Sequence, residues 1–202
     1  FNHTSTTVKA CKKLSKSYNM TSRDYEVLLL AAWFHDTGYI NTYQGHEEES
    51  VKLMKAYLSG NYPDDSIREI EALILSTKIQ TVPDGSMQEI LHDADYISLG
   101  SKNFNMRAEL LQMEWERILN KTYTEDEWAE IQLKFLIDTS FKTEDAVLKY
   151  NEQRLENIIQ QRKKIEEKQS RLLKEAEKNQ AKPVKEGRGI ETLYRSVYDY
   201  HI

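Results

Sequence analysis

Apolar residues recur every three or four positions along most of the chain, which is the spacing of one face of an α-helix. Runs that alternate with a period of two, as half-buried strands do, are few, and the chain has only three prolines and seven glycines. The pattern therefore predicts an all-α protein. The expected helices cover, approximately, residues 3–18, 22–36, 46–58, 64–78, 87–100, 105–119 and 124–138.

The second expected helix contains the longest apolar run, VLLLAAWF at residues 27–34. Because this run is apolar on nearly every side of a helix, it predicts a central, buried helix. It is far too short to cross a bilayer, and no signal peptide is visible.

The composition changes after the seventh helix. Residues 144–182 are rich in Glu, Lys, Gln and Arg and contain neither Pro nor Gly, which predicts one long charged helix. Leu148, Leu155 and Ile165 belong to a seam with alternating three-four spacing, but other seam positions are polar. The helix is therefore either a weak coiled coil or a solvated helix that packs partly on the domain. We expect a domain over 1–142, the long helix over 143–182 and a connector over 183–202.

Charge and cysteine content exclude some classes of protein. The formal net charge is −5, with both signs spread along the 202 residues, whereas a protein that binds duplex nucleic acid normally shows a concentrated basic surface. A single cysteine, Cys11, excludes a disulfide framework and indicates a reducing, cytoplasmic environment. The chain begins with Phe1, so we expect it to be a piece of a longer polypeptide.

Polar residues end the apolar second helix. His35 and Asp36 follow Trp33 and Phe34 directly, and burying them is costly unless they satisfy each other and the backbone or hold an ion. A hydrogen-bonded structural pair is the simpler explanation of this pair alone.

A second carboxylate site along the chain favours a bound ion over a hydrogen-bonded structural pair. In LHDADYISLG, Asp95 shares a face with Leu91 and Leu99, whereas Asp93 shares a face with Glu89, so we expect Asp95 to be the buried carboxylate and Asp93 to face water. His3 lies on the apolar face of the first helix. Three helices thus direct an imidazole or a carboxylate inward, which favours a divalent metal site in a helical bundle.

These residues resemble the HD-domain superfamily of metal-dependent phosphohydrolases over residues 1–140. The matching pattern is His3, then His35 and Asp36, then Asp95 in ADYISLG. The resemblance implies an HD-domain helical bundle that holds Mn, Mg, Fe, Zn, Co or Ni and hydrolyses a phosphate ester with metal-activated water.

Further residues are candidates for the chemistry beside the metal. In addition to a role for Asp36 in catalysis, His46 at the start of a helix is a candidate to contact phosphate or to protonate a leaving group, and Glu47 is a weaker candidate for that role. Lys78 and Arg107 are candidates to bind phosphate oxygens, although the alternative of a solvated charge stays open for both. His92, one turn before Asp95, either supports the ligands or is exposed.

The subfamily stays open. The stretch TGYINTY lacks the Glu-Asp pair of alarmone hydrolases, and neither the GYP motif of cyclic-dinucleotide phosphodiesterases nor the HDxGHxPFGH pattern of triphosphohydrolases is present. We expect a nucleotide or another small phosphate ester as substrate. One alternative is a non-catalytic nucleotide sensor that is coupled through the long helix to a membrane module and forms a homo-oligomer. Another is an HD-type di-iron oxygenase, which usually needs more histidines than these five provide.

The C-terminal stretch GRGIETLYRSVYDYHI resembles the start of the two-helix membrane module of Pycsar anti-phage effectors. The resemblance implies a native protein that continues past residue 202 into membrane helices, anchored at the inner face of the cell membrane. The alternative is an amphipathic helix that packs back on the domain.

Overall fold

The structure is a computed structural model that describes residues 2–79 and 81–180. Its described parts contain eight α-helices, three short 3-10 helices and no strand, so the all-α prediction is confirmed. The elements are α1 (Asn2–Leu14), η1 (Ser15–Ser17), α2 (Ser22–Phe34), η2 (Thr37–Ile40), α3 (His46–Leu58), α4 (Asp64–Leu75), α5 (Ser86–Asp95), η3 (Tyr96–Gly100), α6 (Phe104–Leu119), α7 (Glu125–Asp138) and α8 (Glu144–Gln180).

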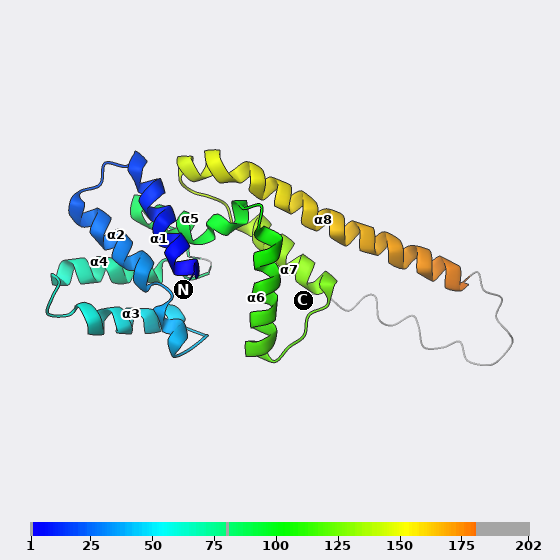
Figure 1. The fold of residues 1–202 in the computed structure, drawn as a ribbon, viewed down its shortest axis with the longest axis horizontal. Coiled ribbons are helices and arrows are strands. Elements are labelled where there is room, and N and C mark those ends of the chain that lie inside the picture. The colour runs from blue at the N-terminus through cyan, green and yellow to red at the C-terminus, as the bar shows by residue number, and fades with distance from the viewer. Residues whose placement is uncertain (1, 80, 181–202) are drawn as a thin grey trace.

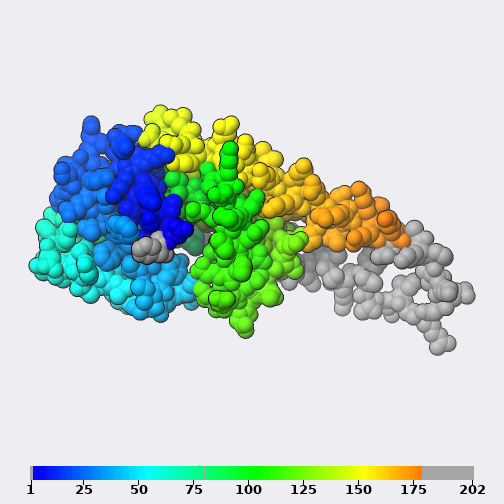
Figure 2. Space-filling model, in the orientation of Figure 1, coloured from blue at the N-terminus to red at the C-terminus, as the bar shows by residue number. Residues whose placement is uncertain are grey.

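Helices α1 to α5 pack together at one end of the molecule, and α6 and α7 lie beside them (Figure 1). Helix α8 packs along η3 and α7, and its C-terminal part extends beyond the body of the protein (Figure 2). Among the helices of the described residues, none combines the length and apolarity that crossing a bilayer requires.

Helix α2 is central but not buried on every side. Its cap is a reciprocal capping box, in which the Thr21 side chain accepts from Asp24 N and the Asp24 side chain accepts from Thr21 N. Leu28, Ala31 and Ala32 are fully buried against α1 and α4, whereas the Trp33 side chain is exposed. The prediction of complete burial was therefore wrong at Trp33, because the helices cover only one side of α2.

The face predicted for Asp93 on α5 was wrong, whereas the Asp95 side chain points inward as expected. Asp93 is fully buried, and it is the carboxylate that the main chain satisfies. Its oxygens accept hydrogen bonds from Lys142 N at 2.9 and 3.0 Å, from Thr143 N at 2.7 Å and from the Thr143 hydroxyl at 2.7 Å. Asp93 therefore anchors the segment that starts α8, a contact about fifty residues away that the local pattern could not indicate.

Polar side chains hold α8 on the domain. Arg154 donates to Thr139 O at 2.7 Å, and Asn157 donates to Leu99 O at 2.8 Å; both residues are buried. Leu148 and Leu155, two residues of the expected coiled-coil seam, do not take part in this packing, and their side chains are exposed. A coiled coil between copies stays a prediction. The connector and its resemblance to a membrane module fall in residues 181–202, outside the described part of the chain.

Candidate metal centre

Four side chains from three segments meet where α1, α2 and α5 converge, and we call them the four-residue cluster: His3, His35, Asp36 and Asp95. His3 comes from the first turn of α1, His35 and Asp36 follow α2, and Asp95 ends α5. His3 Nε2 lies 2.8 Å from Asp95 Oδ1 and 3.3 Å from Asp36 Oδ2. His35 Nε2 lies 3.3 Å from Asp36 Oδ2, 3.4 Å from Asp95 Oδ1 and 3.4 Å from His3 Nε2.

Backbone geometry orients the buried member of the cluster. His35 Nδ1 lies 2.9 Å from Ala32 O, and a carbonyl oxygen only accepts, so Nδ1 carries a proton. Nε2 is therefore the ring nitrogen that faces the other three side chains. A histidine ligand commonly shows this arrangement, with one ring nitrogen tied to the main chain and the other directed to the ion.

The cluster fits a divalent cation. Two atoms that are bound to one ion at about 2.1 Å lie about 3.0 Å apart at a right angle and about 3.4 Å apart at the tetrahedral angle. The five contacts within the cluster span 2.8–3.4 Å. His3, His35 and Asp95 each offer a ligand atom within 4.8 Å of the other two, whereas Asp36 contacts the two histidines. Two imidazoles and two carboxylates suit Mn, Fe, Zn, Co or Ni better than Mg, which prefers oxygen ligands alone.

The cluster is partly open to water. The His35 side chain is buried, Asp95 and Asp36 are mostly buried at 14% and 23% exposure, and His3 is 44% exposed. The inward direction expected for His3 is thus only partly correct, because its ring lies at the rim. The cluster is therefore closed on the His35 side and open to water on the His3 side.

Without a cation, the cluster is held by opposite charges. Burial alone would lower the pKa of His35, but hydrogen bonds to Asp36 and Asp95 and their charges raise it to about 10. Burial would likewise raise the pKa of Asp95, but its hydrogen bonds to His3 and His35 hold that pKa well below the usual range. The metal-free cluster therefore contains a proton that a bound cation would replace.

His46 extends the cluster on the α3 side. Its ring stacks on Tyr39 with centroids 3.8 Å apart, Nε2 lies 3.7 Å from Asp36 Oδ1, and Nδ1 lies 3.5 Å from Glu47 Oε2. Asp36 thus contacts His3 and His35 through one oxygen and faces His46 through the other. Glu47, whose side chain is 11% exposed, contacts His46, and His46 faces Asp36. Both His46 and Glu47, predicted from the sequence, therefore lie beside the cluster.

The other predicted residues lie elsewhere. Lys78 forms an ion pair with Glu48 of α3, and Arg107 on α6 lines a separate cavity of about 420 Å³ together with Thr6 and Lys102. His92 is mostly buried and lies 3.0 Å from Asp93 Oδ1, so it supports the anchor of α8.

Two tyrosines near the cluster were missed by the sequence reasoning. Burial and then the charge of Asp36 raise the pKa of Tyr39, and burial and then the charge of Asp95 raise the pKa of Tyr96. Both hydroxyls therefore keep their protons near neutral pH and can donate hydrogen bonds. Their places in the chain, just after Asp36 and directly after Asp95, were the available signal.

Comparison with known proteins gives the family. Residues 1–100 match the family model described as HD domain, a range that contains the whole four-residue cluster. No curated protein and no solved structure matches the chain. The matched residues are the ones that form α1 to α5 and η3, and residues 1–100 therefore form an HD domain, which indicates the superfamily of metal-dependent phosphohydrolases.

Proposed function

We propose that the four-residue cluster holds a divalent cation and that the protein hydrolyses a nucleotide or another small phosphate ester. The observation that carries this proposal is the convergence of two imidazoles and two carboxylates through contacts of 2.8–3.4 Å, between residues up to 92 positions apart. A bound cation would polarise a phosphoryl oxygen and lower the pKa of a coordinated water.

The protein's own groups would position the substrate. His46 is fixed between the face of Tyr39 and the carbonyl of Tyr43, which its Nδ1 approaches at 3.3 Å, so Nε2 points toward Asp36. A histidine held in this way can donate a proton to a leaving oxygen. The hydroxyls of Tyr39 and Tyr96 are candidate donors to phosphate oxygens, a role expected for Lys78 from the sequence, whereas Lys78 pairs with Glu48.

The first test is turnover. Protein loaded in turn with Mn, Mg, Fe, Co or Ni should release phosphate or a nucleoside monophosphate from a panel of mono-, di-, tri- and cyclic nucleotides. His46→Ala should lower kcat by roughly 100-fold if His46 is the proton donor, whereas Asp138→Ala, at an exposed carboxylate on α7, should leave kcat unchanged. Absence of turnover with every metal and substrate would count strongly against catalysis.

A second test is the pH dependence of metal binding. Because the pKa of His35 is raised to about 10, its ring is charged near neutral pH in the metal-free protein, and binding a cation must displace one proton. We expect affinity for Mn²⁺ to rise with pH, approaching tenfold per pH unit between about pH 7 and 9. Calorimetry in two buffers of different ionisation enthalpy measures the released proton directly. Affinity that does not change over this range would contradict the assignment of His35 as a ligand.

One observation favours a second candidate function, a nucleotide sensor without turnover. Asp95 and Asp93 are two residues apart on α5, and Asp93 binds the start of α8 through Lys142 and Thr143. A change at the cluster therefore acts on a helix that is hydrogen-bonded directly to the start of the long charged helix. Nucleotide binding without hydrolysis, together with a change in oligomeric state, would favour this function over the first.

A further inference from the structure

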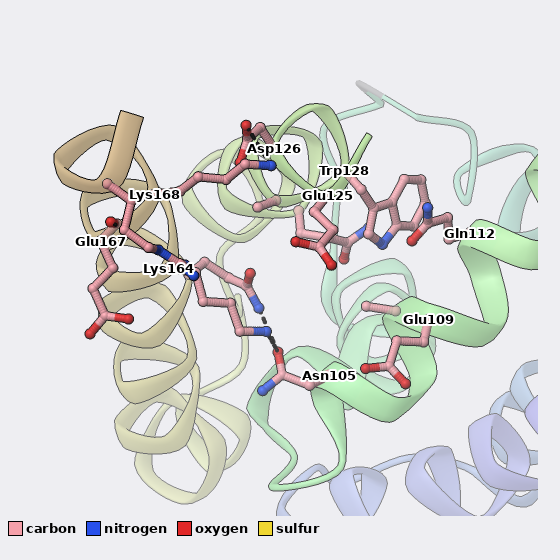
Figure 3. Close-up of a pocket in the computed structure, with 14 residues that line it drawn as sticks. Asn105, Glu109, Gln112, Glu125, Asp126, Trp128, Lys164, Glu167 and Lys168 are labelled. Carbon is pink, nitrogen blue, oxygen red and sulfur yellow. Dashed lines mark hydrogen bonds and ion pairs between the residues drawn. The ribbon is translucent and has the colours of Figure 1, made fainter. Parts of the chain in front are cut away.

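Two cavities border α6, and their linings differ in charge. The one between α6, α7 and α8 has a volume of about 380 Å³ and carries charges of both signs. Figure 3 shows two of its lysines already engaged, Lys168 with Asp126 and Lys164 with Asn105. The other, which we call the basic cavity, has a volume of about 420 Å³, within the range of small-molecule sites. The polar side chains that line the basic cavity are Thr6, Ser98, Ser101, Lys102, Arg107 and Tyr150.

The charged side chains of the basic cavity are cationic. Among the described residues, its lining includes Lys102 and Arg107 but no carboxylate, and neither of these two side chains forms an ion pair. Lys13 adds a third positive charge at the rim, where its Nζ lies 3.1 Å from the hydroxyl oxygen of Tyr150. Because like charges gathered without a counterion repel one another, the cavity attracts an anion.

Hydrogen bonding at the cavity also favours an anion, since acceptors are occupied and donors are available. The Ser101 carbonyl accepts from Phe104 N and from Asn157 Nδ2, both at 3.1 Å. The Ser101 hydroxyl accepts from a backbone N–H at 3.2 Å, and the Tyr150 hydroxyl accepts from Lys13. Neither hydroxyl donates to a residue in the described part of the chain, so each has a proton to offer to a ligand.

The basic cavity shares two elements with the four-residue cluster. Thr6 follows His3 by three residues on α1, which is about 4.5 Å along the helix axis. Ser98, in η3, follows Asp95 by three residues. The two sites are therefore neighbours, although no residue belongs to both.

We propose that the basic cavity binds a phosphate group of a small phosphorylated compound. A phosphate monoester carries a charge of about −1.5 to −2 at pH 7, which matches Lys102 and Arg107 together. Its oxygens would accept from the Arg107 guanidinium, from the Lys102 ammonium group and from the hydroxyls of Ser101 and Tyr150. A carboxylate would neutralise only one of the two charges, and a cation would meet two like charges.

Calorimetry with inorganic phosphate on the full 202-residue chain, before and after EDTA treatment, tests the proposal. Phosphate should bind in both states with a Kd of about 1 mM or lower, and acetate at least about tenfold more weakly. Arg107→Gln should weaken phosphate binding by about tenfold or more, and Lys102→Gln by about threefold. Arg117→Gln, exposed on α6 outside the cavity lining, is the matched control and should bind phosphate as the parent does.

The absence of heat from phosphate at about 10 mM overturns the proposal. Equal phosphate affinity in Arg107→Gln and the parent also overturns it, and so does binding that EDTA abolishes, because the phosphate would then lie at the metal centre. Lys102 is exposed, so Lys102→Gln remains a valid test even if Arg107→Gln impairs folding.

A further titration distinguishes two sources of the phosphate group. If it belongs to the ligand of the metal centre, which rests on the proposed function, Arg107→Gln should weaken binding of adenosine diphosphate to Mn-loaded protein by about tenfold. If it belongs to a separate compound, the affinity for adenosine diphosphate should not change. The test with inorganic phosphate needs no turnover, so its outcome is independent of whether the protein is a phosphohydrolase.

Discussion

Asp95→Ala protein should lose most of its bound divalent metal. Asp95 Oδ1 contacts both His3 Nε2 and His35 Nε2, so removing the carboxylate takes away a direct ligand and leaves the two imidazoles facing each other at 3.4 Å. Loss of a supporting contact to a ligand alone costs about 10- to 100-fold in metal affinity, so loss of the ligand should cost at least about 100-fold. Elemental analysis of protein purified without added metal, together with Mn²⁺ titration, measures this.

The matched control is the neighbouring carboxylate of the same helix. Asp93→Asn should keep the bound metal but lower the free energy of unfolding by about 2–4 kcal/mol, because an amide can no longer accept all the hydrogen bonds from Lys142 and Thr143. Metal occupancy that is equal in Asp95→Ala and in the parent protein would refute the ligand assignment.

Gly38→Ala should destabilise the fold and displace His46. Gly38 is buried in η2, where a Cβ would overlap the His46 carbonyl and come within 2.7 Å of Ser50 N. Its own N–H donates to the Ser50 hydroxyl at 2.8 Å, which fixes the turn after Asp36 against α3. Because backbone and not a flexible side chain must move, we expect a loss of about 3 kcal/mol or more in the free energy of unfolding.

Gly60→Ala is the control for this effect. Gly60 has a φ of +83°, and no atom lies within 4 Å of the position that an added Cβ would take, so alanine there meets backbone strain but no clash. We expect a cost of about 1 kcal/mol and unchanged metal affinity. Urea unfolding of both variants measures the two losses, and equal losses would contradict the role of the close approach at Gly38.

Local sequence patterns were sufficient for the helices and for the members of the cluster. The helical spacing of apolar residues predicted each long helix, with differences of a few residues at the ends, such as α4 ending at Leu75 instead of residue 78. The His35-Asp36 pair was found from its position at a helix end, His3 and Asp95 from the apolar faces of their helices, and all four also match the family pattern. These signals are local, because capping, spacing and motif order are written within single elements.

The environment of each polar side chain could not be predicted in this way. The expectation that Asp93 faces water used only the face of its own helix, while the groups that bind it come from Lys142 and Thr143. Lys78 was a candidate for phosphate binding until the fold placed Glu48 of α3 beside it. Long-range partners such as these are set by how helices pack, and a single helix pattern carries no information about them.

The amino-acid sequence by itself determined that this protein is helical, that a long charged helix follows the first domain, and that two histidines and two aspartates occur in the order of the HD family. The tertiary structure alone decided that Asp93 anchors α8 and that His46 stacks on Tyr39. The physical reason is that helix formation depends on neighbours along the chain, whereas satisfying a buried polar group depends on neighbours in space.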